Sequence, residues 1–224
     1  MAAAVCLVSG GLDSCVAAAV AARDYPELAF LHVSYGQRTE ARERRAFEAV
    51  ADHYGVSKRL RLELPLLARI GGSALTDPSL AVPEGPPGEG IPITYVPFRN
   101  ANLLAMAVSW AEAIGARGVF IGANELDSSG YPDCRRSFLD AFQRVIDEGT
   151  RPGSGIRLVA PLIELDKAGI VRLGVKLSAP LHLTWSCYQA EEVACGRCES
   201  CILRRRGFAA AGLKDPLPYA SGAL

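Results

Sequence analysis

The sequence predicts an α/β fold: an open, mostly parallel, doubly wound sheet with a small helical segment at the C-terminus. Three observations predict it. Short apolar runs alternate with stretches of helical periodicity, a glycine- and serine-rich turn follows the first run, and four cysteines gather near the C-terminus. Alternating strands and helices are typical of parallel sheets covered on both faces. Such sheets bind ligands beyond the carboxyl ends of their strands.

The expected strands are short and unbroken apolar runs, as in strands buried on both faces. Between them, apolar residues recur every three or four positions, which is the spacing of one helix face. Ala46, Phe47, Val50 and Tyr54 form one such stripe. The predicted strands are residues 5–8, 29–33, 118–121 and 156–159, and the predicted helices are residues 14–22, 40–54, 100–114 and 136–147.

Residues 65–97 differ from this pattern, because they hold seven of the fourteen prolines and five glycines with little periodicity. We expect no regular secondary structure there. A long irregular segment is either a functional lid or a surface excursion, and the sequence does not favour one over the other. Residues 214–224 are expected to form a frayed tail.

The charges of the chain balance, with 24 Lys and Arg against 24 Asp and Glu. Proteins that grip nucleic acid through many phosphates usually carry a basic excess, so we expect a small-molecule substrate and no direct nucleic-acid partner. No signal peptide or membrane span is visible, so we expect a cytoplasmic protein without a membrane partner. In a reducing compartment, the seven cysteines indicate metal or redox chemistry before disulfides.

The turn Ser9-Gly10-Gly11-Leu12-Asp13-Ser14 joins the first predicted strand to a helix of small residues. Its glycines let the backbone turn sharply with N–H groups pointing inward, and the positive end of the helix lies behind them, which makes an anion cradle. Asp13 is placed to hold Mg²⁺ against bound phosphates. The Gly-Lys-Ser/Thr ending of a Walker A sequence is missing, so the expected anion is pyrophosphate. The alternative is a turn that uses glycine and serine for geometry alone.

Ser-Gly-Gly-x-Asp-Ser after a first apolar strand resembles the signature of the PP-loop superfamily, the N-type ATP pyrophosphatases, which have an adenine nucleotide alpha hydrolase-like fold. The resemblance implies that ATP is cleaved between its α- and β-phosphates to adenylate a substrate oxygen, while the loop grips the departing pyrophosphate. The ATP-binding residues that it implies are Val8, Ser9, Gly10, Gly11, Leu12, Asp13, Ser14, Cys15, Val16, Ala17 and Ala18.

Cys187, Cys195, Cys198 and Cys201 follow the pattern C-x7-C-x2-C-x2-C. Four thiolates complete the tetrahedral shell of Zn²⁺, and the short spacings bring neighbouring sulfurs together on one knuckle. A site closed by four protein ligands is structural, so we expect one structural zinc ion. The alternatives are buried free cysteines or a Cys-x-x-Cys redox pair. The chain is accordingly divided into an ATP-binding α/β domain (1–180), a zinc-binding C-terminal segment (181–212) and a tail (213–224).

Polar stretches follow the predicted strands and are expected to converge on the rim that carries the phosphate loop. They are Tyr35-Gly36-Gln37-Arg38, Val96-Pro97-Phe98-Arg99-Asn100, Gly122-Ala123-Asn124-Glu125-Leu126-Asp127 and Ser129-Gly130-Tyr131-Pro132-Asp133-Cys134-Arg135. Together with the phosphate loop and the cysteines, this set resembles the QueC family, the 7-cyano-7-deazaguanine synthases. The resemblance extends from Val8 to Phe208. The chain departs from the family pattern at Thr39, Ser128 and Ala160, where histidine, tyrosine and threonine are common.

The resemblance implies an ATP-dependent carbon–nitrogen ligase of queuosine precursor biosynthesis that converts 7-carboxy-7-deazaguanine and ammonia to a nitrile, and it suggests a homodimer. A carboxylate is a poor acceptor because its leaving group would be oxide, and adenylation makes that oxygen a good leaving group. Ammonia then gives an amide, and a second activation gives the nitrile. Mg²⁺ and the loop amides would stabilise the charge that gathers on pyrophosphate.

Arg38 and Arg99 are candidates for holding the triphosphate or the substrate carboxylate, because a guanidinium matches either group in bidentate fashion. Lys167 begins a predicted helix and either reaches the phosphates or is solvated. The sequence identifies no general base. The candidate catalytic residues are Ser9, Asp13, Ser14, Arg38 and Arg99, and the candidate substrate-binding residues are Tyr35, Gln37, Arg38, Arg99, Asn100, Asn124, Asp127 and Asp133. The alternative for each polar residue is a turn cap or a surface salt bridge.

Two other readings remain open. One is a different PP-loop adenylating enzyme, such as an amide ligase, a tRNA thiolase or a deazaguanine relative that modifies a macromolecule. Balanced charge and short length disfavour the thiolase. The other is a non-catalytic zinc-knuckle module with a degenerate nucleotide domain, which the intact Ser9, Asp13 and Ser14 disfavour.

Overall fold

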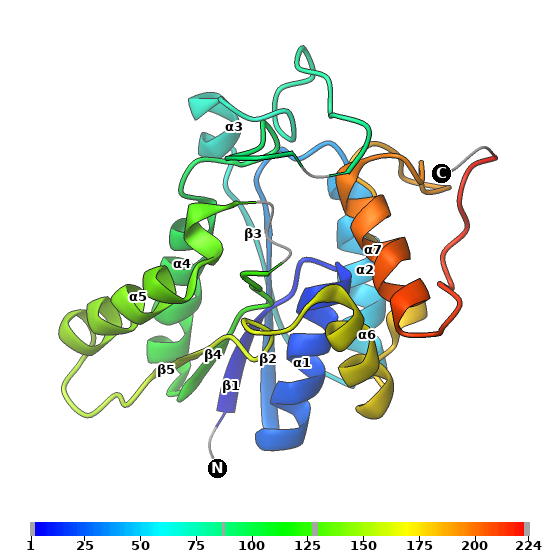
Figure 1. Ribbon diagram of the computed structural model, residues 1–224. Helices are drawn as coiled ribbons and strands as arrows, with labels where there is room; N and C mark the ends of the chain where they lie inside the picture. The colour runs from blue at the N-terminus through cyan, green and yellow to red at the C-terminus, as the bar shows by residue number, and fades with distance from the viewer. Residues whose placement is uncertain (1–2, 87, 127–129, 222–224) are drawn as a thin grey trace.

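Five parallel strands form the central sheet of the computed structural model, which describes residues 3–86, 88–126 and 130–221 (Figure 1). The strand order β3-β2-β1-β4-β5 changes direction between β1 and β4. In open α/β sheets this is where a crevice forms beyond the carboxyl ends of the strands. The expected fold class is therefore confirmed. The strands are β1 (Ala3–Leu7), β2 (Glu27–Ser34), β3 (Lys58–Glu63), β4 (Gly118–Phe120) and β5 (Arg157–Val159).

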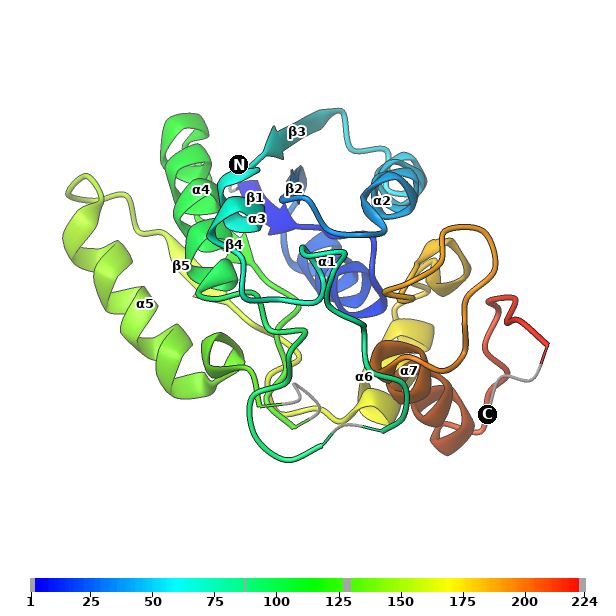
Figure 2. The ribbon, with the colours of Figure 1, turned by 90° about the horizontal axis from the view of Figure 1, so that it is seen from above.

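Helices cover both faces of the sheet, with α4 and α5 on one side and α1, α2, α6 and α7 on the other (Figure 2). Alternation along each strand sends neighbouring side chains to opposite cores. Val5 packs in the core under α4 and α5, whereas Cys6 packs against α1 and α2. The helices are α1 (Leu12–Asp24), α2 (Glu40–His53), α3 (Leu66–Ile70), α4 (Arg99–Ile114), α5 (Arg136–Gly149), α6 (Lys167–Lys176) and α7 (Glu199–Ala210), with 3₁₀ turns η1 (Pro132–Cys134) and η2 (Leu181–Leu183).

Strand β3 was not predicted, because it reads Lys-Arg-Leu-Arg-Leu-Glu and lacks an apolar run. It lies at the edge of the sheet and pairs only with β2 among the described strands. Its Arg59 and Arg61 bond to the same carboxylate, that of Glu48 on α2. Charged side chains are common on edge strands, since they discourage pairing with further chains.

Part of segment 65–97 packs on the rest of the chain, and α3 is a helix that we did not expect there. Leu67, Leu75 and Val96 form a small core with Tyr35. A backbone hydrogen bond of 3.0 Å from Gly85 N–H to the Arg197 carbonyl fastens the segment to the C-terminal part of the chain.

The expected frayed tail is wrong for residues 215–220, because they dock on the C-terminal segment. Ala220 N–H donates to the Ala194 carbonyl at 2.9 Å, and Ala194 N–H donates to the carbonyl of Pro218 at 3.1 Å. Asp215 accepts two bonds of 3.0 and 3.1 Å from Nε of Arg204, a side chain that is only 2% exposed. Residues 222–224 lie outside the described part. No helix described here has the length and apolarity needed to cross a bilayer.

Gly207 allows α7 to pack closely against the first residue of α6. A Cβ at Gly207 would lie 2.4 Å from Lys167 Cγ and 2.9 Å from its Cβ. We therefore expect Gly207→Ala to lower the free energy of unfolding by about 1–3 kcal/mol, as overpacking usually does. Gly149→Ala is the matched control, because a Cβ there meets nothing within 4 Å. Urea unfolding of both variants tests this, and equal midpoints would contradict it.

Candidate active site

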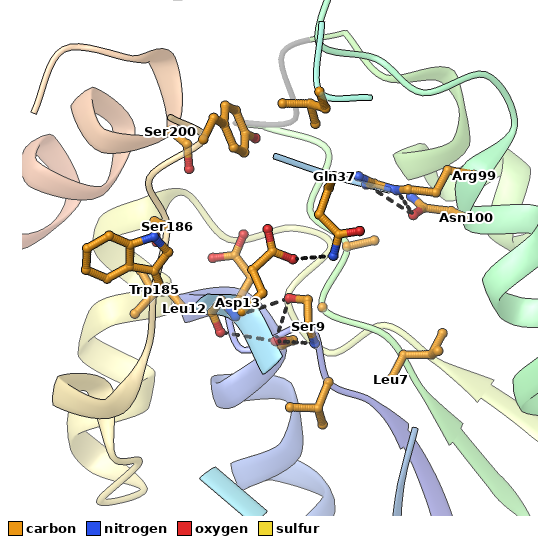
Figure 3. Close-up of a pocket in the computed structure, with 18 of the residues that line it drawn as sticks. Leu7, Ser9, Leu12, Asp13, Gln37, Arg99, Asn100, Trp185, Ser186 and Ser200 are labelled. Carbon is orange, nitrogen blue, oxygen red and sulfur yellow. Dashed lines mark hydrogen bonds between the residues drawn. The ribbon is translucent and has the colours of Figure 1, made fainter. Parts of the chain in front are cut away.

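A pocket of about 280 Å³ opens beyond the carboxyl ends of β1, β2 and β4. Figure 3 shows Ser9 and Asp13 at its base, between Arg99 and Asn100 on one side and Trp185, Ser186 and Ser200 on the other. The first side comes from the start of α4 and the second from residues 185–200. The pocket is therefore lined by segments that lie far apart in the sequence.

The phosphate loop is held in shape by its own serines. Ser9 N–H donates to Ser14 Oγ at 3.2 Å, Ser14 Oγ donates to the Gly11 carbonyl at 3.1 Å, and Gly11 N–H donates to Ser9 Oγ at 3.1 Å. Gly10 has φ +89°, and a Cβ there would lie 2.5 Å from the carbonyl oxygen of Glu43. Only glycine fits such a position. With the N-terminus of α1 lining the pocket, the loop has the form of an anion cradle.

Asp13 is paired with a lysine from a distant part of the chain. Lys167 Nζ lies 2.9 and 2.8 Å from the two carboxylate oxygens, and Asn124 Nδ2 donates to Oδ2 at 3.2 Å. The Lys167 side chain is 13% exposed, so it is not a solvated lysine. Asp166 caps the helix that begins at Lys167, since its Oδ1 accepts from Gly169 N–H at 2.7 Å. That cap fixes where the ammonium enters the pocket.

Arg99 begins α4 and faces Tyr35 at the end of β2. Its Nη1 donates to the Tyr35 hydroxyl at 3.0 Å, and its guanidinium carbon lies 5.5 Å from the centre of the Tyr35 ring. Burial raises the pKa of Tyr35, so the phenol keeps its proton at neutral pH. A guanidinium held in this way presents a fixed cation to the pocket.

Glu43 was not among the predicted site residues, although it lines the pocket. Its carboxylate accepts from Thr39 Oγ1 at 2.9 Å and from Gln37 Nε2 at 3.0 Å. Gln37 is itself fixed, because its Oε1 accepts from Tyr35 N–H at 2.8 Å. Burial raises the pKa of Glu43, while the two hydrogen bonds lower it. The sequence offered one signal for Glu43, which is its spacing of four residues from Thr39, because residues four apart share a helix face.

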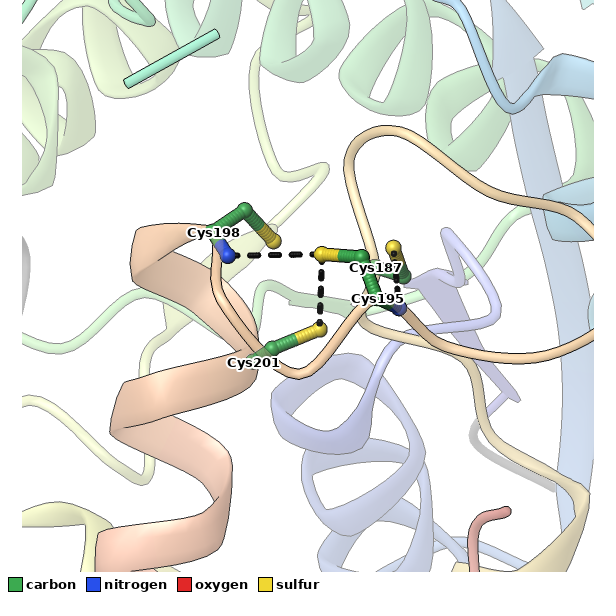
Figure 4. Close-up of side chains that lie close together, drawn as sticks. All are labelled: Cys187, Cys195, Cys198 and Cys201. Carbon is green, nitrogen blue, oxygen red and sulfur yellow. Dashed lines mark hydrogen bonds between the residues drawn. The ribbon is translucent and has the colours of Figure 1, made fainter. Parts of the chain in front are cut away.

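The four cysteines lie together, with all of their sulfurs within 4.8 Å of one another (Figure 4). The sulfurs of Cys195 and Cys201 are 3.9 Å apart. Tetrahedral Zn–S bonds of about 2.3 Å place sulfurs about 3.8 Å apart, so the cluster fits a zinc ion. Cys187 Sγ accepts from the backbone N–H groups of Gln189 and Ala190 at 3.4 and 3.3 Å. Hydrogen bonds from Cys198 and Cys201 lower the pKa of Cys187. Four cysteines can therefore bind one metal ion.

The cysteine cluster also forms part of the pocket wall. Cys187 lines the pocket, and so do its neighbours Ser186 and Tyr188. Trp185 N–H donates to the Gly10 carbonyl at 2.8 Å, which ties this wall to the phosphate loop. A shift of the cysteine cluster would therefore be transmitted to the phosphate loop through this hydrogen bond.

A family model, described as queuosine biosynthesis protein QueC, matches residues 3–212. The chain belongs to the QueC family. It is 59% identical over 223 residues to the 7-cyano-7-deazaguanine synthase of Acidobacterium capsulatum, covering 97% of this chain and 96% of that relative. It is 55% identical over 219 residues to the synthase of the same name from Chlorobaculum parvum, covering 96% of both chains.

A solved 4-thiouridine synthetase–RNA complex with bound ATP is similar in fold. It has a TM-score of 0.50 and 18% identity, covering 80% of this chain and 41% of that one. At that identity the likeness supports the fold alone.

Six of the eight candidate substrate-binding residues line the pocket. One of them, Arg38, has a guanidinium that bonds to backbone carbonyls. Its Nε donates to the Ala74 carbonyl at 2.7 Å, and Nη2 donates to the carbonyls of Asp77, at 2.9 Å, and Leu80. These bonds tie Arg38 to segment 65–97, and its predicted role in holding the triphosphate or the substrate carboxylate stays a prediction. The other five are Tyr35, Gln37, Arg99, Asn100 and Asn124.

Asp133 is buried and is not among the described residues that line the pocket. Its Oδ2 accepts from the backbone N–H of Asn100 at 2.8 Å, and its carbonyl accepts from Asn100 Nδ2 at 3.1 Å. Asp133 thus holds the N-terminus of α4, where an anion is favourable, and its predicted contact with the substrate stays a prediction. Asp127 and Ser128 lie outside the described residues.

Proposed function

We propose that this chain is an ATP-dependent carbon–nitrogen ligase that converts 7-carboxy-7-deazaguanine and ammonia to 7-cyano-7-deazaguanine. One observation carries the proposal: the phosphate loop with its Asp13–Lys167 pair opens into the same pocket as the Arg99–Tyr35 pair. An adenylating enzyme needs an anion cradle beside a cation that can hold a carboxylate. The near full-length relatives named 7-cyano-7-deazaguanine synthase supply the substrate class.

The two parts of the pocket divide the chemistry between them. The loop and Lys167 would hold the outer phosphates of ATP, while the fixed guanidinium of Arg99 would hold the substrate carboxylate. Asp13 would hold Mg²⁺, which would neutralise charge on the departing pyrophosphate. The four cysteines would hold one structural Zn²⁺, which would stabilise the opposite wall.

The reaction consumes two ATP molecules for each nitrile. The carboxylate first attacks the α-phosphate and displaces pyrophosphate, and ammonia then displaces AMP to leave an amide and a proton. The amide oxygen attacks a second ATP and displaces pyrophosphate, and the nitrogen loses a first proton to give a neutral adenylated amide. Loss of AMP together with the second proton gives the nitrile. Both carboxylate oxygens therefore leave on AMP.

Oxygen labelling tests this proposal. The purified protein is incubated with ATP, Mg²⁺, ammonium and 7-carboxy-7-deazaguanine whose carboxylate carries ¹⁸O, and products are read by mass spectrometry. We expect two AMP and two pyrophosphate per nitrile, with the label in AMP alone. Formation of ADP, or label in phosphate or pyrophosphate, would contradict adenylation.

A further inference from the structure

Nitrile formation needs a group that accepts a proton in the pocket. In the last step of the proposed reaction an N–H bond of the adenylated amide breaks, and its electron pair forms the third carbon–nitrogen bond. The carbon–oxygen bond to AMP breaks at the same time. The proton must go to a base that lies within hydrogen-bond reach of that nitrogen.

The described residues that line the pocket offer few bases. They include no histidine, and their carboxylates are those of Asp13 and Glu43. Asp13 accepts from Lys167 with both oxygens and is the proposed Mg²⁺ ligand. Burial raises the pKa of Cys134 to about 11 and that of Tyr131 to about 12, so both keep their protons at neutral pH. Glu43 is therefore the carboxylate left for proton transfer.

The position of Glu43 suits this task. Its main chain packs on Gly10 of the phosphate loop, where the Glu43 carbonyl oxygen is 2.5 Å from an ideal Cβ. Its side chain is oriented by Thr39 and Gln37, both neutral donors, and not by a cation. The reacting carbon must lie between the loop that holds pyrophosphate and the guanidinium of Arg99. Glu43 lines this pocket, its main chain lies against Gly10 of the loop, and its carboxylate is near enough to Arg99 for the guanidinium to lower its pKa.

We propose that Glu43 is the general base that takes the proton from the adenylated amide as AMP leaves, and then releases it to water. This inference rests on the proposed function. Thr39 and Gln37 hold the carboxylate in place, and neither side chain carries a positive charge. The Thr39 hydroxyl contacts one carboxylate oxygen of Glu43, and the Gln37 amide contacts the other.

The pH dependence of the last step follows from the surroundings of Glu43. Burial raises its pKa, while Thr39, Gln37 and Arg99 lower it, and Glu40 on the same helix raises it. Since the carboxylate acts only when ionised, the rate should fall as the pH decreases through this pKa. A raised pKa places that fall at a higher pH than for an ordinary glutamate.

Single-turnover assays on the metal-loaded protein test the proposal. They follow the two half-reactions separately, one starting from the acid and one starting from the amide. We expect Glu43→Gln to slow conversion of amide to nitrile about 100-fold, with amide accumulating and the acid limb of the pH profile lost. The acid-to-amide half should lose much less, because excess ammonia can take that proton. Glu43→Asp keeps a carboxylate and should recover part of the rate together with the acid limb.

Glu40→Gln is the matched control, because it removes the same charge from the same helix but Glu40 does not line the pocket. It should leave both halves within about twofold and the melting temperature close to that of Glu43→Gln. Unchanged amide conversion, equal slowing of both halves, or an acid limb that persists in Glu43→Gln would each overturn the assignment. Absence of nitrile with the unsubstituted protein would instead overturn the proposed function.

Discussion

An Asp13→Asn protein is expected to lose turnover by about 1,000-fold while remaining folded. Charge that develops on the transferred phosphates is stabilised by groups already fixed in place, and removal of one such group costs about 10²–10³ in rate. The substitution also removes the proposed Mg²⁺ ligand. It keeps the shape of the side chain and the oxygen that faces Lys167, so the loop retains its packing.

The loss of charge at Asp13 also leaves the Lys167 ammonium without its ionic partner. The Lys167 side chain is largely buried, but the remaining amide oxygen still faces its ammonium, so we expect a moderate loss of stability, about 1–2 kcal/mol. A Lys167→Met, Asp13→Asn double variant should recover stability but not turnover. This separates the role of the pair in folding from its role in catalysis.

Pyrophosphate release, ATP affinity by calorimetry and urea unfolding measure these effects. Asp24→Asn is the matched control, because it removes the same charge from the same helix at an exposed salt bridge with Arg23. It should leave turnover within about twofold. An Asp13→Asn protein that keeps more than about a tenth of its Mg²⁺-dependent pyrophosphate release would show that Asp13 is not part of the phosphate site.

Cys198→Ser is expected to lose the metal and, with it, at least about 4 kcal/mol of unfolding free energy. Binding of a structural metal is folding energy for the residues that surround it, and the core around this cluster is small. Cys198 also forms an isolated bridge with Glu84, so the damage should extend into segment 65–97. Because Trp185 is tied to Gly10, turnover should fall as well.

Elemental analysis of metal per chain, together with thermal melting with and without a chelator, tests this expectation. Cys6→Ala is the control, because Cys6 is buried in β1 and lies outside the cluster. It should cost some packing energy but leave the metal content unchanged. Full zinc retention by Cys198→Ser would remove the metal assignment.

The parts of the fold that could be predicted are those whose signal is local. A continuous apolar run such as residues 5–8 and a helical stripe such as that of Phe47 report burial directly, and the structure has β1 and α2 at these places. Strand β3 could not be found in this way, because an edge strand is half exposed and tolerates charge. The docking of residues 215–220 was missed for a related reason, since it depends on the buried Arg204 of another element.

The sequence by itself determined the phosphate loop and the cysteine cluster, because their residues lie close together in the chain and their spacing sets their chemistry. Only the tertiary structure decided which single residues complete the site. Lys167 pairs with Asp13, which lies 154 positions away in the sequence. Arg38 donates to a backbone carbonyl of segment 65–97, and Asp133 accepts from the backbone N–H of Asn100 at the N-terminus of α4. Each outcome depends on which partner the fold brings within about 3 Å, a distance that no local pattern encodes.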